Sequence, residues 1–597
     1  MRKLSLAACA ALLAAGALAV RAASPTPGLV VHEWGTFLAM NGSDGVTLDG
    51  MYHEEHALPG FVHARGREEL RLPTSNIKGE TPVIYFYSDT PVRASVQVKF
   101  PSGIWTQWYP QARLLGPSLV QTGSLLHPQN GWISWDVDIV PPSQPHGTLP
   151  ATEKDALWNY TRDVDAAYLH PVAFPTPTAF RENDPNEWER FIFYRGLGEA
   201  KLPLNVSADA AVLKCDRTLN QPLRHVYLLR VEGGRGVYRY VPSLNCGERL
   251  DPVVPAMTGA KPVETFASLL ADDLAARLVE SGLYAKEARA MVNTWRTSYF
   301  ATDGIRVLFV LPQQWTDTFI PMQVSPPPER LVRVMVGRIE LLTPERERAA
   351  QTALANLTSS DAHVREDAFA TLQRQGRYAE PIVRRTMASS PDERVRALCR
   401  RLLLTDYITD IRTALTNADD GRPLRQEPVY ARAQLASLLR DVGLTEEARQ
   451  EGELALKELA TMPKPTMTDH DSRNRFRALA RANEGAGNDA AALKWYNDFI
   501  EFGTGYRGCS GCHTSAGPLN DEFFRDWWAG RRFAEIAWRT GEAPQMIRSN
   551  ESRLAQAPQD FLVRVRLAYL YEGRGDTQAA ERVWDGMEQR PAVRAGF

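Results

Sequence analysis

The stretch YRGCSGCHTSAGP, residues 506–518, places two thiols and an imidazole within five positions. Cys509 and Cys512 stand three positions apart, and His513 follows directly. At this spacing the two thiols can form thioethers with the two vinyl groups of one porphyrin, and the histidine can ligate its iron. The pattern predicts one covalently bound haem c, with Cys509 and Cys512 as the attachment residues and His513 as an axial ligand.

Two other kinds of site remain open for the same thiols. A C-x-x-C pair in an exported protein can be a plain disulfide or a redox-active dithiol, although the strand–helix–strand setting usual for such dithiols is missing around residues 503–526. A zinc site needs four ligands, and the chain has no second cysteine pair to supply them. The sequence therefore favours haem, with a disulfide as the main alternative.

Neighbouring residues could complete a haem site. Met546, 34 residues after Cys512, is a candidate sixth ligand of the iron, and a vacant sixth position also remains open. Further candidates for the sixth ligand are Met462, Met467, His470 and Met587. Four aromatic residues could wall a porphyrin or fill a helix core: Phe523, Phe524, Trp527 and Trp528. Three cations could meet haem propionates or simply face solvent: Arg525, Arg531 and Arg532.

A second group of potential ligands lies near the N-terminus, in VHEWGTF and MYHEEHALPGFVHARG. Four of the eleven histidines fall within 32 residues, His32, His53, His56 and His63, together with Glu33, Glu54 and Glu55. Histidine with carboxylates is ligand chemistry for zinc, iron or copper. His53 and His56 are three positions apart in a segment without helical signals, so the H-E-x-x-H pattern is absent. The cluster predicts either a non-haem metal site on His53 and His56 or a polar network that fixes the N-terminal strands. The VHEWGTF opening resembles that of uncharacterised secreted bacterial proteins, a resemblance that implies no activity.

The first 22 residues have the features of a secretory signal. A basic start, Met1-Arg2-Lys3, precedes an apolar run from Leu4 to Val20, and small residues allow cleavage after Ala22. A lipobox-like LAAC ending at Cys9 leaves too short an apolar run for a lipoprotein signal. No other stretch reaches the roughly 18 apolar residues of a membrane span. We expect a periplasmic or secreted protein without a transmembrane segment, in the kind of compartment where haem c is attached.

Cleavage would leave five cysteines, an odd number. Cys215 and Cys246 flank a strand-rich stretch, and an oxidising compartment favours a disulfide between them, with two buried thiols as the alternative.

The net charge of −2 gives no basic field that would attract nucleic acid. The sequence shows no phosphate loop, nucleophile elbow or dinucleotide fingerprint, so no enzymatic activity is assigned.

The pattern of apolar residues predicts a multidomain α+β protein. Residues 23–255 read as a β-rich domain, because PVIYFYS, ASVQVKF, GIWTQWYP, GWISWDVDIV and RFIFYRG have strand composition. HVYLLRVEGGRGVYRYV predicts a hairpin with Gly233 and Gly234 in its turn. Residues 256–343 combine helical periodicity with two strands and are expected to form an α+β segment packed on that domain.

From residue 344 the pattern becomes helical. Asp361, Val364, Arg365 and Ala368 recur 31 residues later as Asp392, Val395, Arg396 and Cys399. This spacing resembles a pair of HEAT repeats, over 344–404, and implies that Cys399 occupies a packing position equivalent to that of Ala368.

Residues 405–502 and 527–597 resemble tetratricopeptide repeats. Gly443, Gly487, Gly541 and Gly575 align as inter-helix glycines, and Ala436, Ala480, Ala534 and Ala568 stand seven positions before them. The family resemblance implies stacked helix pairs in a solenoid that binds protein partners. The C-x-x-C-H loop, 503–526, would be an insert in that solenoid.

These features predict an exported mono-haem, c-type cytochrome-like protein. Its expected role is electron transfer or redox sensing within a protein complex organised by the helical repeats. A haem-free interaction scaffold with a C-x-x-C disulfide, and a metalloenzyme that uses the N-terminal histidines, are the alternative functions.

Overall fold

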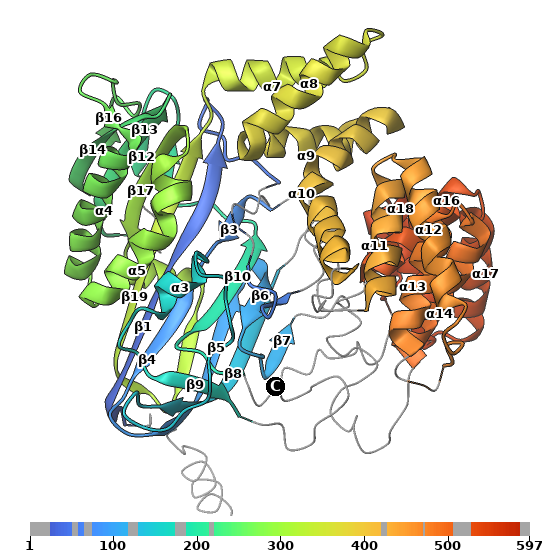
Figure 1. Ribbon diagram of the computed structural model, residues 1–597, viewed down its shortest axis with the longest axis horizontal. Helices are drawn as coiled ribbons and strands as arrows, with labels where there is room; N and C mark the ends of the chain where they lie inside the picture. The colour runs from blue at the N-terminus through green and yellow to red at the C-terminus, as the bar shows by residue number, and fades with distance from the viewer. Residues whose placement is uncertain are drawn as a thin grey trace, which may run out of the picture.

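The computed structural model describes residues 24–50, 56, 58–64, 75–116, 129–172, 187–213, 220–419, 427–467, 469, 472–505 and 527–585. Within them a β-rich N-terminal part stands beside a helical C-terminal part, with a row of helices between (Figure 1). The predicted α+β class, with strands first and helices after, is confirmed at this level.

A large mixed sheet forms the centre of the N-terminal part. Its strands are β1 (Thr26–Asn41), β2 (His63–Ala64), β3 (Ile77–Gly79), β4 (Val83–Tyr87), β6 (Gly103–Tyr109), β10 (Ile192–Gly198), β13 (Leu223–Glu232), β14 (Arg235–Leu244), β16 (Lys261–Pro262), β17 (Gly304–Leu311) and β19 (Pro328–Leu341). In the described chain their order is β16-β14-β13-β17-β19-β1-β3-β10-β6-β2, and β4 pairs with β1 and β10.

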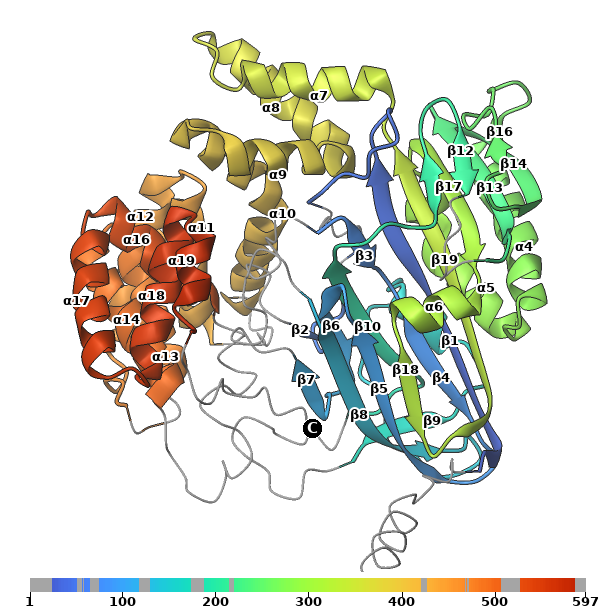
Figure 2. The ribbon, with the colours of Figure 1, turned by 180° about the vertical axis from the view of Figure 1, so that it is seen from behind.

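Both faces of this sheet are covered. One face, here called the helix side, carries α3 (Trp158–Arg162), α4 (Val263–Glu280), α5 (Ala285–Trp295) and the π-helix Arg296–Ala301. The opposite face carries α6 (Gln313–Phe319) and a second sheet of β5 (Val92–Phe100), β7 (Leu114–Gly116), β8 (Gly131–Val140), β9 (Tyr168–Pro171) and β18 (Met322–Ser325), seen in Figure 2. A small sheet consists of β11 (Leu204–Val206), β12 (Ala211–Leu213) and β15 (Arg249–Leu250).

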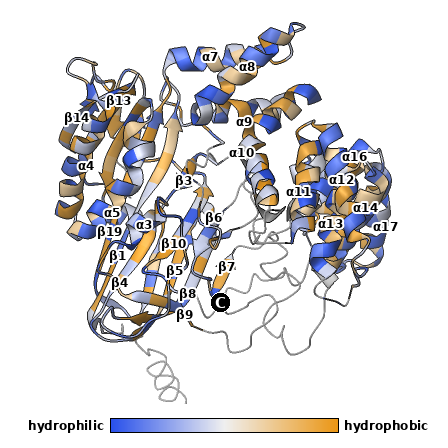
Figure 3. Ribbon diagram, in the orientation of Figure 1, coloured by the Kyte–Doolittle hydropathy of each residue, from blue (hydrophilic) through white to orange (hydrophobic). Residues whose placement is uncertain are grey.

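Two hydrophobic cores result, one on each face. Successive residues of a strand point to opposite faces, so Leu228 joins the core under the second sheet, whereas Leu229 joins the core under the helices. Strands buried on both faces need nearly continuous apolar runs, which explains GIRVLFVL in β17. Figure 3 shows the apolar colouring along these strands.

The segment 256–343 contributes two central strands to the same sheet. β19 pairs in parallel with β1, from Val30 opposite Arg330 to Asn41 opposite Leu341, and antiparallel with β17. The N-terminal strand therefore lies beside the last strand of this part, about 300 positions away in the chain.

The row of helices between the two parts consists of α7 (Pro344–Asn356), α8 (Ala362–Gln375), the 3₁₀ turn Gly376–Tyr378, α9 (Glu380–Ser389) and α10 (Glu393–Asp419). The two predicted repeats make the same local contacts. Arg365 and Arg396 each donate from Nη1 to a serine carbonyl six residues earlier, at 2.7 Å in both cases. Cys399 is fully buried in the same core cluster as Ala368, and burial raises the pKa of its thiol to about 11. Cys399 is therefore a packing residue.

The C-terminal part is built from α11 (Pro428–Asp441), α12 (Thr445–Leu459), α13 (Ser472–Gly485), α14 (Asp489–Gly505), α16 (Trp527–Arg539), α17 (Ala543–Gln556), α18 (Phe561–Arg574) and α19 (Thr577–Arg582). The aligned glycines Gly443, Gly487, Gly541 and Gly575 each follow the first helix of a pair, with φ between 80° and 84°. Glycine reaches this left-handed conformation without the cost of a Cβ. In the described residues no helix is long and apolar enough to cross a membrane.

Candidate functional site

The C-x-x-C-H residues Cys509, Cys512 and His513 lie outside the described residues. The described residues before the motif end with α14 at Gly505, and the described residues after it begin with α16 at Trp527. Helices α14 and α16 contact each other, and buried aromatic residues of the shared core pack between them and α18. The motif thus connects two helices that are neighbours in space.

The candidate sixth ligands differ in their surroundings. Met546 lies on α17 and is half-buried against the core formed by α13, α14, α16 and α18. Met462 packs against the core between α11, α12 and α13, whereas Met467 is 41% exposed. His470 and Met587 lie outside the described residues. Of the described candidates, Met546 alone packs against the same core as the helices that flank the motif.

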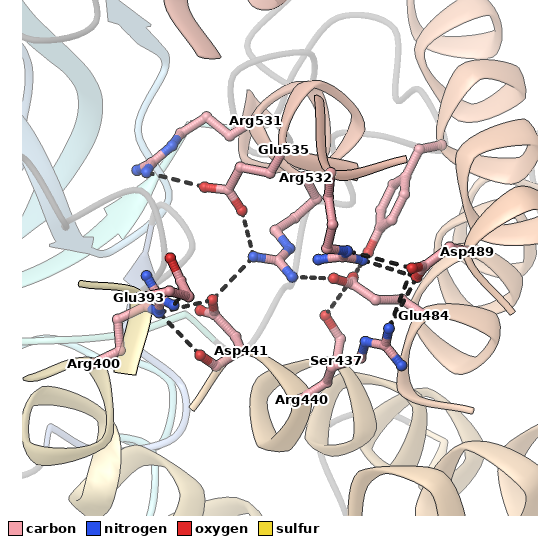
Figure 4. A network of polar contacts seen from close by, with 12 residues as sticks. Glu393, Arg400, Ser437, Arg440, Asp441, Glu484, Asp489, Arg531, Arg532 and Glu535 are labelled. Carbon is pink, nitrogen blue, oxygen red and sulfur yellow. Dashed lines mark hydrogen bonds and ion pairs between the residues drawn. The ribbon is translucent and has the colours of Figure 1, made fainter. Parts of the chain in front are cut away.

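Arg532 does not face solvent. Its guanidinium contacts the carboxylates of Glu484 and Glu535 and lies 3.0 Å from Asp441 Oδ1, and its side chain is 5% exposed (Figure 4). Burial alone would lower the pKa of this guanidinium, but the three carboxylates raise it. Arg532 is therefore a buried, ion-paired core residue, and the contact with a haem propionate that the sequence allows stays a prediction.

The network around Arg532 joins five helices. Glu484 on α13 also accepts hydrogen bonds from Ser437 Oγ at 2.9 Å and from Tyr496 Oη at 2.7 Å. Asp441, at the end of α11, also pairs with Arg400 of α10 at 3.2 Å. The charged groups thus connect α16, after the motif, to α10, α11, α13 and α14, before it (Figure 4).

Cys246 is disulfide-bonded, as an oxidising compartment would allow. Its predicted partner, Cys215, lies outside the described residues, so the pairing itself stays a prediction. The backbone on both sides brings the two segments together, because Gly247 N donates to Leu213 O at 2.9 Å.

His32 and Glu33 of VHEWGTF are consecutive residues of β1 and point to opposite faces of the central sheet. On the helix side, His32 Nδ1 lies 2.8 Å from Glu287 Oε2, and both side chains are fully buried. On the other side, Glu33 lies 2.6 Å from Arg333 Nε and accepts a hydrogen bond from Tyr194. His32 is therefore held by a hydrogen-bonding contact to Glu287 of α5, and Glu33 by an ion pair with Arg333 of β19.

The other N-terminal histidines of the cluster are His53, His56 and His63. His53 lies outside the described residues, whereas His56 lines a cavity. His63 Nε2 lies 2.5 Å from Glu187 Oε1. In the described part of the chain no group of three histidine, cysteine, aspartate or glutamate residues could hold a metal ion.

The cavity that His56 lines occupies about 330 Å³ on the helix side of the central sheet. Its walls come from β1, β4, α3, α5 and the π-helix, and they combine aromatic rings with Glu80, Thr81 and Arg195. Sequence reasoning missed this site, because Glu80 and Trp295 are 215 positions apart and neither stands in a recognisable motif.

Comparison with known proteins assigns no family. No protein-family model matches the chain, and no curated protein is similar to it.

Proposed function

We propose that this chain is an exported mono-haem, c-type cytochrome-like protein that transfers electrons or senses redox state within a protein complex. The C-S-G-C-H sequence at residues 509–513 carries the proposal. The secretory signal predicted at residues 1–22 supports it, because haem c is attached outside the cytoplasm.

In this proposal Cys509 and Cys512 hold the haem through thioethers, and His513 ligates the iron. The bound haem would supply one-electron chemistry, with a potential set by its axial ligands and its surroundings. Buried aromatic residues pack between α18 and the two helices before and after the motif, α14 and α16. A haem that contacts this core would be partly shielded from water, which would influence its potential.

The proposed binding of a protein partner rests on the helix pairs of α11–α14 and α16–α19. Their glycine positions and stacking resemble tetratricopeptide repeats, whose concave surfaces bind protein segments. We infer that the redox or signalling partner is a protein held by these repeats, together with the HEAT-like helices α7–α10.

Covalent haem is the expected result when the full chain is exported in a host with the cytochrome c maturation machinery. The protein should give a c-type pyridine haemochrome spectrum, and the haem should stay with the polypeptide after acid–acetone extraction. Replacing both attachment residues, Cys509→Ala with Cys512→Ala, should abolish this signal. Cys399→Ala is the matched control, because Cys399 is a buried packing residue.

Two outcomes would contradict the haem proposal. One is covalent haem that persists after both attachment cysteines are replaced. The other is a folded, colourless wild-type protein from a competent host, which would favour a disulfide between Cys509 and Cys512 in an interaction scaffold.

Met546 is the proposed sixth ligand, and Met546→Leu tests it in the haem-loaded protein. Loss of a thioether ligand should lower the reduction potential, since methionine ligation raises it, and should let the ferrous iron bind carbon monoxide. Met462→Leu and Met467→Leu are matched controls that should leave both properties unchanged. An unaltered potential in Met546→Leu would assign the sixth position to another group or leave it vacant.

A further inference from the structure

The histidine of VHEWGTF has a partner on each of its ring nitrogens. His32 lies on β1, and its side chain is fully buried on the helix side of the central sheet. Its Nδ1 lies 2.8 Å from Glu287 Oε2 of α5, and its Nε2 lies 3.3 Å from Arg330 Nη2 of β19. Arg330 is exposed. The imidazole thus connects a buried carboxylate to a guanidinium at the surface, and the proposed haem function uses neither contact.

The contact with Arg330 indicates the protonation state of His32 in this structure. A guanidinium can only donate hydrogen bonds, so Nε2 of His32 is the acceptor and carries no proton. The single ring proton then lies on Nδ1, from which it is donated to Glu287. His32 is therefore a neutral imidazole between an anion and a cation.

Glu287 is held in place by other groups of the chain. Its Oε1 accepts a hydrogen bond from Tyr87 Oη at 2.8 Å, and its Oε2 accepts one from the backbone N–H of Tyr284 at 2.7 Å. Both contacts are independent of His32. A second proton on His32 would strengthen its attraction to this carboxylate, so Glu287 would hold the imidazolium in the core.

Arg330 is held less firmly. Its Nη2 also donates to Tyr284 Oη at 2.8 Å, and its guanidinium lies over the Tyr284 ring, 5.6 Å from the centroid. Among the described residues no carboxylate pairs with Arg330. Arg330 can therefore turn into solvent without leaving a buried counter-charge, but this movement would break its contact with Tyr284, the residue before α5.

The other titratable groups that face His32 are tyrosines. Tyr85 stands opposite His32 on β4, and the rings of Tyr87 and Tyr284 lie 5.5 and 4.5 Å from the imidazole. Burial, and after it the charge of Glu287, raises the pKa of both Tyr85 and Tyr87, so these hydroxyls stay protonated. Histidine is the side chain that most readily changes charge between about pH 5 and pH 8. His32 is therefore the group of this cluster that takes up a proton in mild acid.

We propose that this cluster is a pH-sensitive switch, in which protonation of His32 at Nε2 displaces Arg330 and frees the turn before α5 from β19. A protonated Nε2 can only donate, so it would meet the N–H groups of Arg330 without an acceptor between them. Two cations would also stand 3.3 Å apart. The exposed Arg330 is the partner that leaves, because Glu287 retains the imidazolium. The switch lies outside the helices that flank the C-x-x-C-H motif and does not depend on haem.

Hydrogen exchange measured by mass spectrometry on the full chain tests the switch at about pH 8 and about pH 5. Each variant is compared with the wild type at the same pH, so that the intrinsic pH dependence of exchange cancels. At the higher pH, peptides covering 281–288 and 328–334 should exchange about three- to tenfold faster in Arg330→Met than in the wild type, since hydrogen bonds are lost. At the lower pH the two proteins should exchange equally, because Arg330 has already left His32 in the wild type.

Two further comparisons connect this response to His32. His32→Gln keeps an acceptor for Arg330 but cannot take up a proton, so in this background Arg330→Met should have the same effect at both pH values. Arg289→Met is the matched control for Arg330→Met. Arg289 lies on α5, is 51% exposed and pairs with Asp272 of α4, so its exchange relative to the wild type should not depend on pH.

The proposal is overturned if Arg330→Met has the same effect at both pH values in the otherwise wild-type protein. It is also overturned if the pH dependence persists in the His32→Gln background, because another group would then be the one that titrates. Arg330 is exposed, so Arg330→Met should fold, and the first comparison decides the proposal even if His32→Gln does not fold.

Discussion

Replacing Arg333 with methionine is expected to destabilise the N-terminal part by about 3–5 kcal/mol, the usual cost of removing one partner of a buried ion pair. Arg333 and Glu33 are both fully buried, and their closest atoms are 2.6 Å apart. Without the guanidinium, Glu33 would keep the hydrogen bond from Tyr194 but lose its counter-charge. Asp317, the other partner of Arg333, is 47% exposed and can be solvated.

Hydrogen exchange measured by mass spectrometry on the full chain would detect this loss. Peptides from β1 and β19 should exchange about two to four orders of magnitude faster in Arg333→Met than in the wild type, since about 1.4 kcal/mol corresponds to a factor of ten. Arg93→Met is the matched control, because Arg93 pairs with Asp138 on the second sheet while 67% exposed, and it should leave these peptides unchanged. Equal exchange in Arg333→Met and Arg93→Met would show that Glu33 needs no buried counter-charge.

The double variant Glu33→Gln with Arg333→Met distinguishes the energy of the Glu33–Arg333 ion pair from the energy of the other contacts of Arg333. Removing both charges leaves no unpaired ion in the core, so part of the lost protection should return, with a coupling of about 0.5–3 kcal/mol. No recovery would mean that the effect of Arg333 comes from its contacts to Asp317 and to the carbonyl of Ile320, 2.9 Å from Nη2.

Local sequence patterns predicted the positions of the strands well. They did not predict which strands pair when these are far apart in the chain. PVIYFYS, GIWTQWYP and GWISWDVDIV contain β4, β6 and β8, and ASVQVKF covers β5 except for its first two residues. The glycine turn of the β13–β14 hairpin lies where the sequence placed it. Strand composition and turn residues act over a few positions, so they can be read locally. The parallel pairing of β1 with β19 depends on which faces are buried in the assembled sheet, which no short window records.

The partners of the buried polar residues could not be predicted from the local sequence either. The sequence places His32 and Glu33 among possible metal ligands, because histidine beside glutamate is ligand chemistry. In the folded chain each has a separate partner, since His32 contacts Glu287 and Glu33 pairs with Arg333. From the sequence, Arg532 looks like an exposed residue on a helix. Its burial depends on Glu484 and Asp441, which are 48 and 91 positions away and so cannot be recognised as partners from the local sequence. Cys399 was the favourable case: the 31-residue repeat alone predicted its packing position.

Replacing Arg532 with methionine should loosen the C-terminal helices from one another. The variant leaves Glu484, whose side chain is fully buried, with hydrogen bonds from Ser437 and Tyr496 but without a counter-charge. The expected cost is about 3–5 kcal/mol. Because Arg532 joins α16 to α11 and α13, faster exchange should appear in all three helices and not in β1 or β19. Arg449→Met is the matched control, since Arg449 pairs with Glu446 and Glu453 of its own helix while 46% exposed, and it should change little.

The same variant distinguishes the ion-pair role of Arg532 from a role in holding haem. The contacts to Glu484, Asp441 and Glu535 exist within the chain itself, so Arg532→Met should accelerate exchange equally in the haem-loaded protein and in the Cys509→Ala, Cys512→Ala background. A propionate contact would instead make the loss of protection depend on haem and would shift the reduction potential. Equal destabilisation with an unchanged potential would identify the network as the feature that holds α16 to the helices before the motif, whether or not haem is attached.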